Sequence, residues 1–485
     1  MPADDPRGDR VATLMKAGRF AEAAQVLEKV LGASPGWSVG WLNLGLCRIR
    51  LREGDAAVRA LEEGIRLDPA QPRVRLSLAD AAILQGRPDR AIHWCREECR
   101  QFPGETGSWV ALGMAFERVD HPEAGDAYRE ALRLSPGDPG VVAHLGRWLH
   151  HQHDLIAAMA LLDPVRRLHP ENGRLQWQWT VNCFLRGDIT PGLRHLDSRW
   201  AAPDFPRSRA LDAIPVWSGG TPTREPILVE PEQGYGDTIQ FLRFVPDLVR
   251  RGHRVWLGLP RALERLVGNS MEVERIITGT QPAAGAGVRI PIMSLPARLG
   301  VRGEDLCGDP YLPTIGSSSK APGKPGGPLT VGLVWRGNPR HANDRRRSLP
   351  LRELHPILRL PGIDWVSLQW GEDTHGEIER AVEAGCRIRK DPTPDGDFQD
   401  SADRIRRTDL VLSVDTALCH LAGALGHPVW TLLPYNPDWR WGLTGEQTPW
   451  YRSMRLYRQA ALDSWREPIA RLEQDLQAAS SSVAY

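Results

Sequence analysis

The chain has 485 residues, 41% of them hydrophobic and 25% charged, as in ordinary globular proteins, and this length predicts two or three domains. Its 61 basic and 60 acidic residues nearly cancel, so the overall charge gives no reason to expect nucleic acid or an anionic membrane as partner. The seven cysteines form no Cys-x-x-Cys pair, and no apolar run approaches the roughly 20 residues that span a bilayer, so we expect a cytoplasmic protein with reduced thiols and no integral membrane segment.

A repeat occupies residues 1–200. Five prolines are separated by 34, 34, 33 and 34 residues, and an alanine stands twelve residues before each of them. Small residues let two antiparallel helices approach closely, and proline marks the end of a helix. The pattern resembles the tetratricopeptide repeat, whose period is about 34 residues, and predicts an α-helical solenoid. The phased positions are Pro35, Pro69, Pro103, Pro136 and Pro170, with Ala23, Ala57, Ala91, Ala124 and Ala158 and with pairs beginning at Leu44, Leu78, Leu112 and Leu145.

A solenoid of this type presents a concave surface, which usually binds a peptide or a protein. We therefore expect a protein acceptor or another protein partner on the concave face of the array. The alternative is that the array only packs against the second half of the chain.

The composition changes after Trp200. Residues 201–225 contain four prolines and predict a linker, and residues 317–328, rich in Ser, Gly, Pro and Lys, predict a second one. Short apolar runs alternate with helical stretches around that second linker, which predicts parallel sheets. We expect two Rossmann-like units, an acceptor-side unit at 226–316 and a nucleotide-sugar-side unit at 329–485, with a ligand cleft between them. The expected strands are 227–230, 254–259, 329–335, 363–369, 409–414 and 428–433.

The segment Glu232-Gln-Gly-Tyr-Gly-Asp237 follows the first of these strands and opens a helix. Its two glycines permit a tight turn and a close approach of the backbone to a ligand. It is not a dinucleotide-binding fingerprint, because the third glycine of Gly-x-Gly-x-x-Gly is missing. Asp237 is expected at the helix start, where it serves either as a general base or as an N-cap.

A second strand-to-helix turn is expected at Ser413-Val-Asp-Thr-Ala-Leu-Cys-His420. The first-turn N–H groups and the helix dipole attract an anion. Asp415 and Thr416 are placed to cap the helix, with Thr416 also facing a diphosphate, and His420 lies one turn further along. The alternative is a capped core helix in which His420 makes an internal hydrogen bond.

Two more loops leave predicted strands. Trp335-Arg-Gly-Asn338 leads into a cationic stretch that ends in Arg346 and Arg347, which suits phosphate recognition unless the loop is simply solvated. Asp438-Trp-Arg-Trp441 follows the strand expected at 428–433, and its two indole rings offer stacking faces for a base or a sugar.

Together, the motifs around Glu232–Asp237, Val331–Asn338, Arg347–Ser348, Asp415–Gly426 and Pro434–Trp441 resemble the bacterial heptosyltransferase family (glycosyltransferase family 9), over about residues 215–480. The resemblance implies a GT-B fold, an inverting mechanism and a nucleotide-sugar donor. It implies Asp237 as the base and an acceptor-side loop of Gln233, Gly234, Tyr235 and Gly236. It implies Thr416, Ala417 and His420 as the donor diphosphate site, with Arg346 or Arg347 in place of a phosphate-binding cation of the family. The other residues that we expect on the donor-binding side are Trp335, Arg336, Asn338, Ser348, Asp415, Asp438 and Trp439.

The sequence departs from the family pattern at two places. Ala417 stands where heptosyltransferases usually have glycine, and the usual lysine of the cationic loop is absent, so the resemblance does not specify ADP-heptose as donor. The order of repeats followed by GT-B also resembles bacterial flagellin and other protein O-glycosyltransferases, whose repeats bind the protein acceptor.

We therefore predict an inverting glycosyltransferase that moves a sugar from a nucleotide sugar to a hydroxyl, on a flagellin-like protein held by the repeats. No Asp-x-Asp stands at the end of a predicted strand, so we expect no metal and no other cofactor. Two alternatives stay open: heptosyltransferase-like transfer to an envelope polysaccharide, and a non-catalytic repeat scaffold that binds a nucleotide sugar. The sequence does not specify the sugar, the nucleotide, the acceptor or the oligomeric state.

Overall fold

The computed structural model describes residues 6–201, 214–222, 224–268, 270–279, 285–312, 327–341, 343–371, 375–392 and 396–483. The chain forms two compact units, Met1–Gln178 and Trp179–Tyr485. Residues 202–213 and 223 of the first predicted linker, 201–225, and residues 317–326 of the second, 317–328, lie outside the described residues. Within the described ranges, no helix has the length and apolar character needed to cross a membrane.

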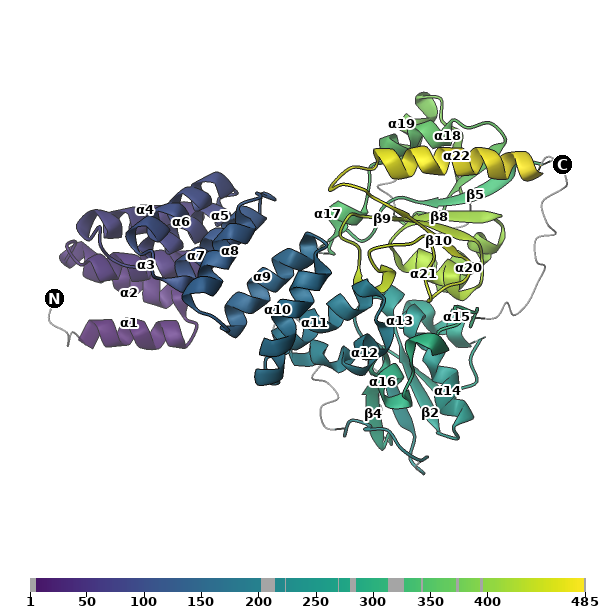
Figure 1. The fold of residues 1–485 in the computed structure, drawn as a ribbon, viewed down its shortest axis with the longest axis horizontal. Coiled ribbons are helices and arrows are strands. Elements are labelled where there is room, and N and C mark those ends of the chain that lie inside the picture. The colour runs from purple at the N-terminus through teal and green to yellow at the C-terminus, as the bar shows by residue number, and fades with distance from the viewer. Residues whose placement is uncertain are drawn as a thin grey trace. The chain divides into compact units, whose positions relative to one another are not determined.

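The first unit is a stack of helices joined by short turns (Figure 1). Each phased proline follows the end of a helix by two residues, so the predicted repeat is confirmed: the unit is a tetratricopeptide solenoid. The helices are α1 (Pro6–Lys16), α2 (Phe20–Ala33), α3 (Ser38–Arg50), α4 (Gly54–Leu67), α5 (Val74–Leu84), α6 (Pro88–Gln101), α7 (Thr106–Glu117), α8 (Ala124–Leu134), α9 (Pro139–His151), α10 (Leu155–Leu168) and α11 (Gly173–Arg186), which continues into the second unit.

Small residues hold the two helices of a repeat together. The five phased alanines are all buried. A Cβ on Gly45 would lie 2.4 Å from the Leu61 side chain, and one on Gly113 would lie 2.4 Å from the Tyr128 ring, so only glycine fits at these contacts. Each glycine thus receives a large side chain from the second helix of its own repeat.

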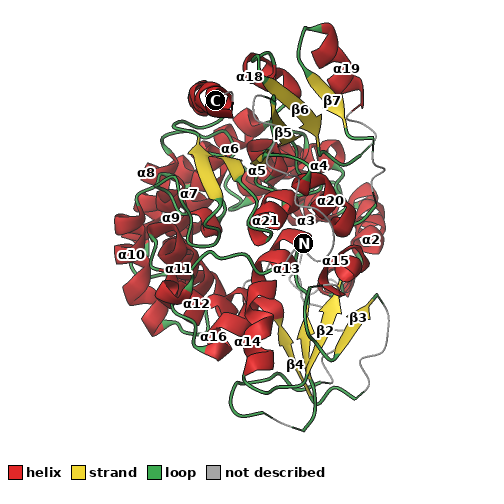
Figure 2. Cartoon of the chain, turned by 90° about the vertical axis from the view of Figure 1, so that its right-hand side faces the viewer, coloured by secondary structure: helices red, strands yellow, loops and turns green. Residues whose placement is uncertain are grey.

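The second unit contains two parallel sheets (Figure 2). The four-stranded sheet has the order β3-β2-β1-β4 and the six-stranded sheet has the order β10-β9-β8-β5-β6-β7, with every strand pair parallel. The strands are β1 (Ile227–Glu230), β2 (Val255–Leu259), β3 (Arg275–Thr278), β4 (Val288–Pro291), β5 (Leu329–Val334), β6 (Ile363–Ser367), β7 (Ile388–Lys390), β8 (Leu410–Val414), β9 (Val429–Leu433) and β10 (Met454–Arg458).

The second unit also contains helices before, between and after these strands. They are α12 (Ile189–Arg194), α13 (Tyr235–Phe241), α14 (Val245–Arg250), α15 (Glu264–Gly268), α16 (Leu295–Leu299), α17 (Asp344–Arg347), α18 (His355–Leu358), α19 (His375–Glu383), α20 (Phe398–Arg406), α21 (Ala417–Ala424) and α22 (Arg466–Val483). Short 3₁₀ helices lie at Leu196–Ala201, Leu242–Phe244, Arg261–Leu263, Ile292–Ser294, Gly303–Asp305, Leu351–Leu354 and Trp439–Trp441. The helical stretch between β1 and β2 is interrupted near Pro246, which has no N–H to donate.

The topology brings three predicted loops to one region. The loops after β1, β5 and β8 leave the carboxyl ends of strands that are internal to their sheets. In each sheet the strand order reverses beside one of these strands, and ligands of open parallel sheets bind at such reversals. Helix α13, after β1, and helix α21, after β8, lie next to each other in both views (Figures 1 and 2).

The boundary between the two units differs from the predicted end of the array at residue 200. The division falls inside α11, so residues 179–200 belong to the second unit. Arg199 shows why: its side chain is completely buried, and its guanidinium donates to both carboxylate oxygens of Glu232, at 2.6 and 3.1 Å. This ion pair fixes the start of the loop that carries Asp237.

Candidate active site

The starts of α13 and α21 are in direct contact. A Cβ on Gly236 would lie 2.9 Å from His420 Cδ2, 3.5 Å from His420 Nε2 and 3.6 Å from Ala417 Cα. Glycine is therefore required at position 236 for the two turns to approach this closely. The structure thus brings the predicted acceptor-side loop and the predicted diphosphate turn together at one contact, whose surroundings are called the crevice below.

Asp237 lies in the first turn of α13, with both carboxylate oxygens occupied. Oδ2 accepts from the backbone N–H of Gly234 at 2.9 Å, and Oδ1 accepts from the guanidinium of Arg440. Asp237 is the third residue of the helix, so it is not the N-cap itself but bonds back to the N–H of the N-cap residue. Arg440 comes from the loop after β9 and joins the two halves of the unit.

Gln233, rather than a glycine, has the left-handed backbone conformation in the loop before α13. Gln233, with φ of 59°, adopts the left-handed conformation, whereas Gly234 does not. Gln233, Gly234 and Tyr235 are exposed. The Tyr235 ring lies 5.0 Å from the ring of Phe398 at the start of α20. Gly234 and Gly236 therefore do not set the turn; Gly236 instead makes room for His420.

The start of α21 is open to a ligand in one respect. Thr416 is the N-cap residue, but its side chain makes no capping hydrogen bond; its hydroxyl lies 3.3 Å from Ser413 Oγ. The prediction that the Thr416 side chain caps the helix is thus wrong. Thr416 and Ala417 are half-buried at the mouth of the crevice, whereas Asp415 is buried.

His420 and Asp415 lie side by side in a region of strong electrostatic effects. Burial lowers the pKa of His420 well below 6.5, and nearby Arg440 and other arginines lower it further. Burial raises the pKa of Asp415 to about 6, and the Asp438 carboxylate adds to this rise while Arg347 opposes it. His420 Nε2 lies 3.9 Å from Asp415 Oδ1, too far for a hydrogen bond. The imidazole is therefore neutral, and its Nε2 edge faces the crevice.

Arg347 is the cation of the predicted loop that reaches this crevice. Its Nη1 donates to the backbone carbonyl of Asp415 at 3.0 Å, and its Nε lies 3.4 Å from Asp344 Oδ1. Ser348 supports this geometry, because its hydroxyl accepts from Gly337 N and donates to Asp344, each at 2.8 Å. Arg346 is half-buried on the same short helix, α17.

Three predicted donor residues do not point toward the α21 turn. The indole of Trp335 is buried in the core and donates to Glu377 at 2.7 Å. Arg336 lies 3.3 Å from the same Glu377 carboxylate. Asn338 is exposed and accepts from the backbone N–H of Arg340 at 3.0 Å. Trp335 and Arg336 therefore hold the loop in place rather than present a ligand-binding side chain.

The prediction that Trp439 and Trp441 offer stacking faces is contradicted by their packing. The Trp439 ring lies between Phe184, at 4.3 Å, and the Arg440 guanidinium, at 4.1 Å. The Trp441 ring stacks on His420, with centroids 5.1 Å apart. Both rings are buried, because the loop folds back onto the crevice instead of lining an open one. Asp438 accepts from Arg440 Nη1 at 2.6 Å.

Sequence reasoning missed three residues that organise the crevice. Arg440 lies inside the Asp438–Trp441 motif, so a cation in that loop was a usable signal. Tyr451, whose hydroxyl lies 2.9 Å from His420 Nδ1, had no local signal. Neither had Arg243, whose guanidinium lies over the Tyr451 ring at 4.8 Å and donates to Trp450 O at 2.7 Å.

One group in the described residues has the composition of a metal site. Ligand-type atoms of Asp415, Cys419 and His420 lie within 4.8 Å of one another. The thiol is a poor ligand, however, because burial raises the pKa of Cys419 and Sγ donates to Thr416 O at 3.0 Å. The group therefore fits a hydrogen-bonded core better than a bound cation.

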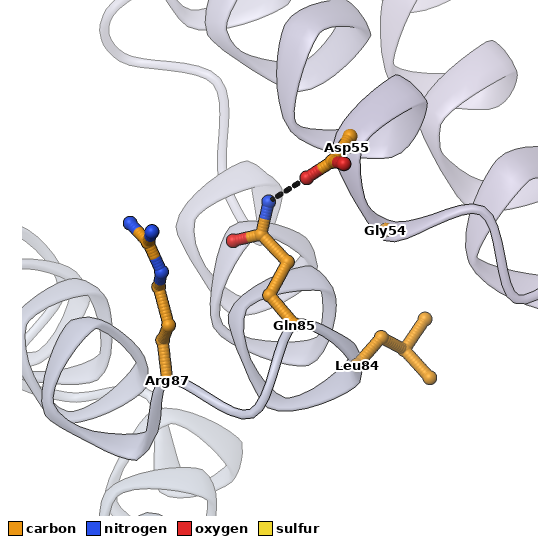
Figure 3. A pocket seen from close by; sticks show the side chains of 5 residues that line it. All are labelled: Gly54, Asp55, Leu84, Gln85 and Arg87. Carbon is orange, nitrogen blue, oxygen red and sulfur yellow. Dashed lines mark hydrogen bonds between the residues drawn. The ribbon is translucent and has the colours of Figure 1, made fainter.

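A hollow of about 380 Å³ lies within the repeat array. It is lined by Gly54, Asp55, Leu84, Gln85 and Arg87 (Figure 3). Gln85 donates to Asp55 at 2.7 Å across it, and the Arg87 side chain extends beside that of Gln85. The hollow lies where consecutive repeats meet and carries no catalytic arrangement.

Comparison with known proteins agrees with this geometry. Residues 42–106 match the tetratricopeptide repeat family, and residues 352–464 match glycosyltransferase family 9 (heptosyltransferase). The chain combines tetratricopeptide repeats with a glycosyltransferase family 9 domain.

Two curated proteins and one solved structure illustrate the similarity. Protein FlbA of Caulobacter vibrioides is 26% identical over 97% of this chain and 72% of its own length. Human protein O-mannosyl-transferase TMTC1 is 24% identical over 40% of this chain and 21% of its own length. A solved structure titled as the functional characterization of Pseudomonas aeruginosa pilF covers 41% of this chain and 91% of that one, with 17% identity and a TM-score of 0.36.

Proposed function

We propose that the second unit is an inverting, metal-independent glycosyltransferase of the GT-B type, which moves a sugar from a nucleotide sugar to an acceptor hydroxyl. The observation that carries the proposal is the contact between the α13 and α21 turns at Gly236 and His420. This contact supports the proposal because it brings the Asp237 turn next to a helix start that could bind an anion, and the reaction needs both parts.

The chemistry divides between the two turns. Asp237 takes the proton of the acceptor hydroxyl while the oxygen attacks the anomeric carbon and the diphosphate leaves. The N–H groups at the start of α21, together with Arg347, Thr416 and His420, hold the leaving diphosphate. No metal is assigned to this step, because the helix dipole and the guanidinium supply the positive charge.

The proposed acceptor is a protein, flagellin-like in kind, docked on the repeats. The matched relatives support this choice, since one carries protein O-mannosyl transfer in its name and matches over 40% of this chain. The heptosyltransferase description of the matched family favours an envelope polysaccharide acceptor instead.

A different observation favours a non-catalytic scaffold that only binds the nucleotide sugar. Both Asp237 oxygens are engaged by Arg440 and by Gly234 N–H. Arg440 must release its oxygen, or share it with the acceptor, before Asp237 can accept a proton.

A screen of nucleotide sugars by thermal shift, followed by assay of sugar release without acceptor, separates these functions. Release identifies an enzyme, whereas binding without release identifies a scaffold. Replacing Thr416 and His420 by Ala should weaken nucleotide binding by about 1.5–3 kcal/mol for each hydrogen bond lost to the charged diphosphate. Unchanged affinity in calorimetry would remove the α21 turn from the proposal.

Removal of the repeats tests the acceptor. A chain that begins at residue 179 should keep donor binding and lose transfer to a protein acceptor, because tethering no longer raises the acceptor concentration. A chain that begins at residue 201 is a matched control. It lacks Arg199 and leaves Glu232 buried without its partner, so it should be destabilised by about 3–5 kcal/mol. Full transfer by a folded chain that begins at residue 179 would argue against docking on the repeats.

A further inference from the structure

The two ring nitrogens of His420 differ: Nδ1 has a hydrogen-bonding neighbour, whereas Nε2 lies 3.9 Å from Asp415, beyond hydrogen-bonding distance. Nδ1 lies 2.9 Å from the Tyr451 hydroxyl. The opposite edge of the ring, Cδ2 and Nε2, faces Gly236, where a side chain would collide with it. The ring face stacks on Trp441, so the imidazole has a single orientation. Nε2 is therefore the ring nitrogen on the side of the α13 turn.

Tyr451 is itself held in one place. Its ring lies against Gly423 of α21, where a Cβ would stand 2.4 Å from Cδ1, and it is completely buried. Arg243 covers the ring at 4.8 Å and fixes the adjacent backbone through Trp450 O. The Tyr451 side chain thus lies along α21, and its hydroxyl is positioned next to His420.

The charges around the ring select one tautomer. Burial chiefly keeps the pKa of Tyr451 well above 10 and that of His420 well below 6.5, so the hydroxyl keeps its proton and the imidazole carries only one. If that proton were on Nδ1, the lone pair of Nε2 would face the Asp415 oxygen 3.9 Å away, which is repulsive. A proton on Nε2 removes this repulsion and leaves Nδ1 to accept from Tyr451.

We propose that Tyr451 is a positioning residue for His420: its hydroxyl donates to Nδ1 and fixes the Nε2–H tautomer, which presents one N–H to the leaving diphosphate. This inference rests on the proposed function. No proton is transferred; the imidazole serves as a neutral hydrogen-bond donor whose direction is set from behind.

Nitrogen NMR of the full chain labelled with ¹⁵N-histidine tests the tautomer directly. His420→Gln identifies the His420 signals, and two-bond proton correlations show which ring nitrogen carries the proton. We expect Nε2–H in the unaltered chain and a substantial share of Nδ1–H in Tyr451→Phe. An Nδ1–H tautomer in the unaltered chain overturns the proposal without any variant, and so does a Tyr451→Phe chain with an unchanged signal pattern.

Tyr457→Phe is the matched control. Tyr457 is likewise buried, but its hydroxyl donates to Asp475 Oδ2, at 2.8 Å, and not to His420. The control should keep the Nε2–H pattern, and comparable melting temperatures would show that both variants fold.

The second readout is nucleotide affinity. Calorimetry with ADP, GDP, UDP and CDP first identifies the nucleotide that binds most tightly, and the variants are then compared with that nucleotide. Affinity should fall about tenfold in Tyr451→Phe, the effect of one misdirected hydrogen bond, and stay unchanged in Tyr457→Phe. Equal affinity in Tyr451→Phe and the unaltered chain would overturn the diphosphate part of the proposal. If the unaltered chain bound none of the four nucleotides, the proposed function would fail, while the NMR result would still decide the role of Tyr451.

Discussion

The turn that begins α13 and the turn that begins α21 have similar local structure but differ in how far their polar groups are hydrogen-bonded. Each follows an internal parallel strand and starts a short helix. At α13, both oxygens of Asp237 already have donors. At α21, the Thr416 side chain makes no cap, and Nε2 of His420 lies beyond hydrogen-bonding distance of Asp415. The same local motif therefore gives a satisfied carboxylate in one place and available donors in the other, and distant residues make the difference.

The largest difference between the two turns is expected when Asp237 is replaced. Asp237→Asn keeps the shape of the side chain but removes its basicity, so turnover should fall about 10²–10⁴-fold with donor affinity little changed. Steady-state kinetics with calorimetry of the donor measures both quantities. Asp247→Asn, which removes a carboxylate paired with Arg250 on α14, is the control and should retain turnover. Near-full activity of Asp237→Asn would leave Asp237 with only its structural role at the start of α13.

Gly236→Ala tests whether the two turns must touch. The added Cβ would stand 2.9 Å from His420 Cδ2, so we expect a loss of about 1–3 kcal/mol of stability and weaker donor binding. Gly107→Ala, at a position in α7 with no neighbouring atom within 4 Å, should not lower the melting temperature. Normal stability and donor affinity of Gly236→Ala would show that the turns separate without consequence.

The α21 turn should respond to pH through Asp415. Because burial raises the pKa of this carboxyl to about 6, it loses its negative charge as the pH falls through that value, while His420 stays neutral. Affinity for a nucleotide sugar should therefore increase about tenfold from pH 7.5 to 5, since a unit charge roughly 8 Å away contributes about 1.4 kcal/mol at an effective dielectric constant near 30. Asp415→Asn should bind with the same affinity at both pH values; a persisting pH dependence would assign it to another group.

Chelation of metal ions is expected to have no effect on turnover. If α21 and Arg347 supply the positive charge alone, EDTA should leave turnover unchanged. Activity lost on chelation and restored by magnesium or manganese would contradict metal independence, and would direct attention to Asp415, Cys419 and His420.

The sequence was most informative where the structural cause is local. The phased prolines and alanines mark helix ends and helix contacts within one repeat, and all of them have these roles in the structure. The six predicted strands are present with small shifts at their ends, because continuous apolar runs are typical of buried parallel strands. β3, β4, β7 and β10 were missed, since they carry charged residues or end in proline and their pairing depends on neighbours.

The site could be predicted only in part for the same reason. The two turns and Arg347 were identified from loops that follow strands, and the structure places them together. The burial of Trp335, Trp439 and Trp441 could not be read from their motifs, because it depends on residues such as Phe184 and Glu377 far away in the chain.

The glycine contacts of the array have a consequence for how such a chain changes over time. Gly45 receives Leu61, and Gly113 receives Tyr128, each within a single repeat. Duplication or loss of a whole repeat therefore carries both members of the contact and preserves its fit. Asp237 and Arg440 lie 203 positions apart and have no such protection, because any change on one side must be matched on the other. The array is free to vary in length across descendants, whereas the crevice can change only by coordinated substitutions.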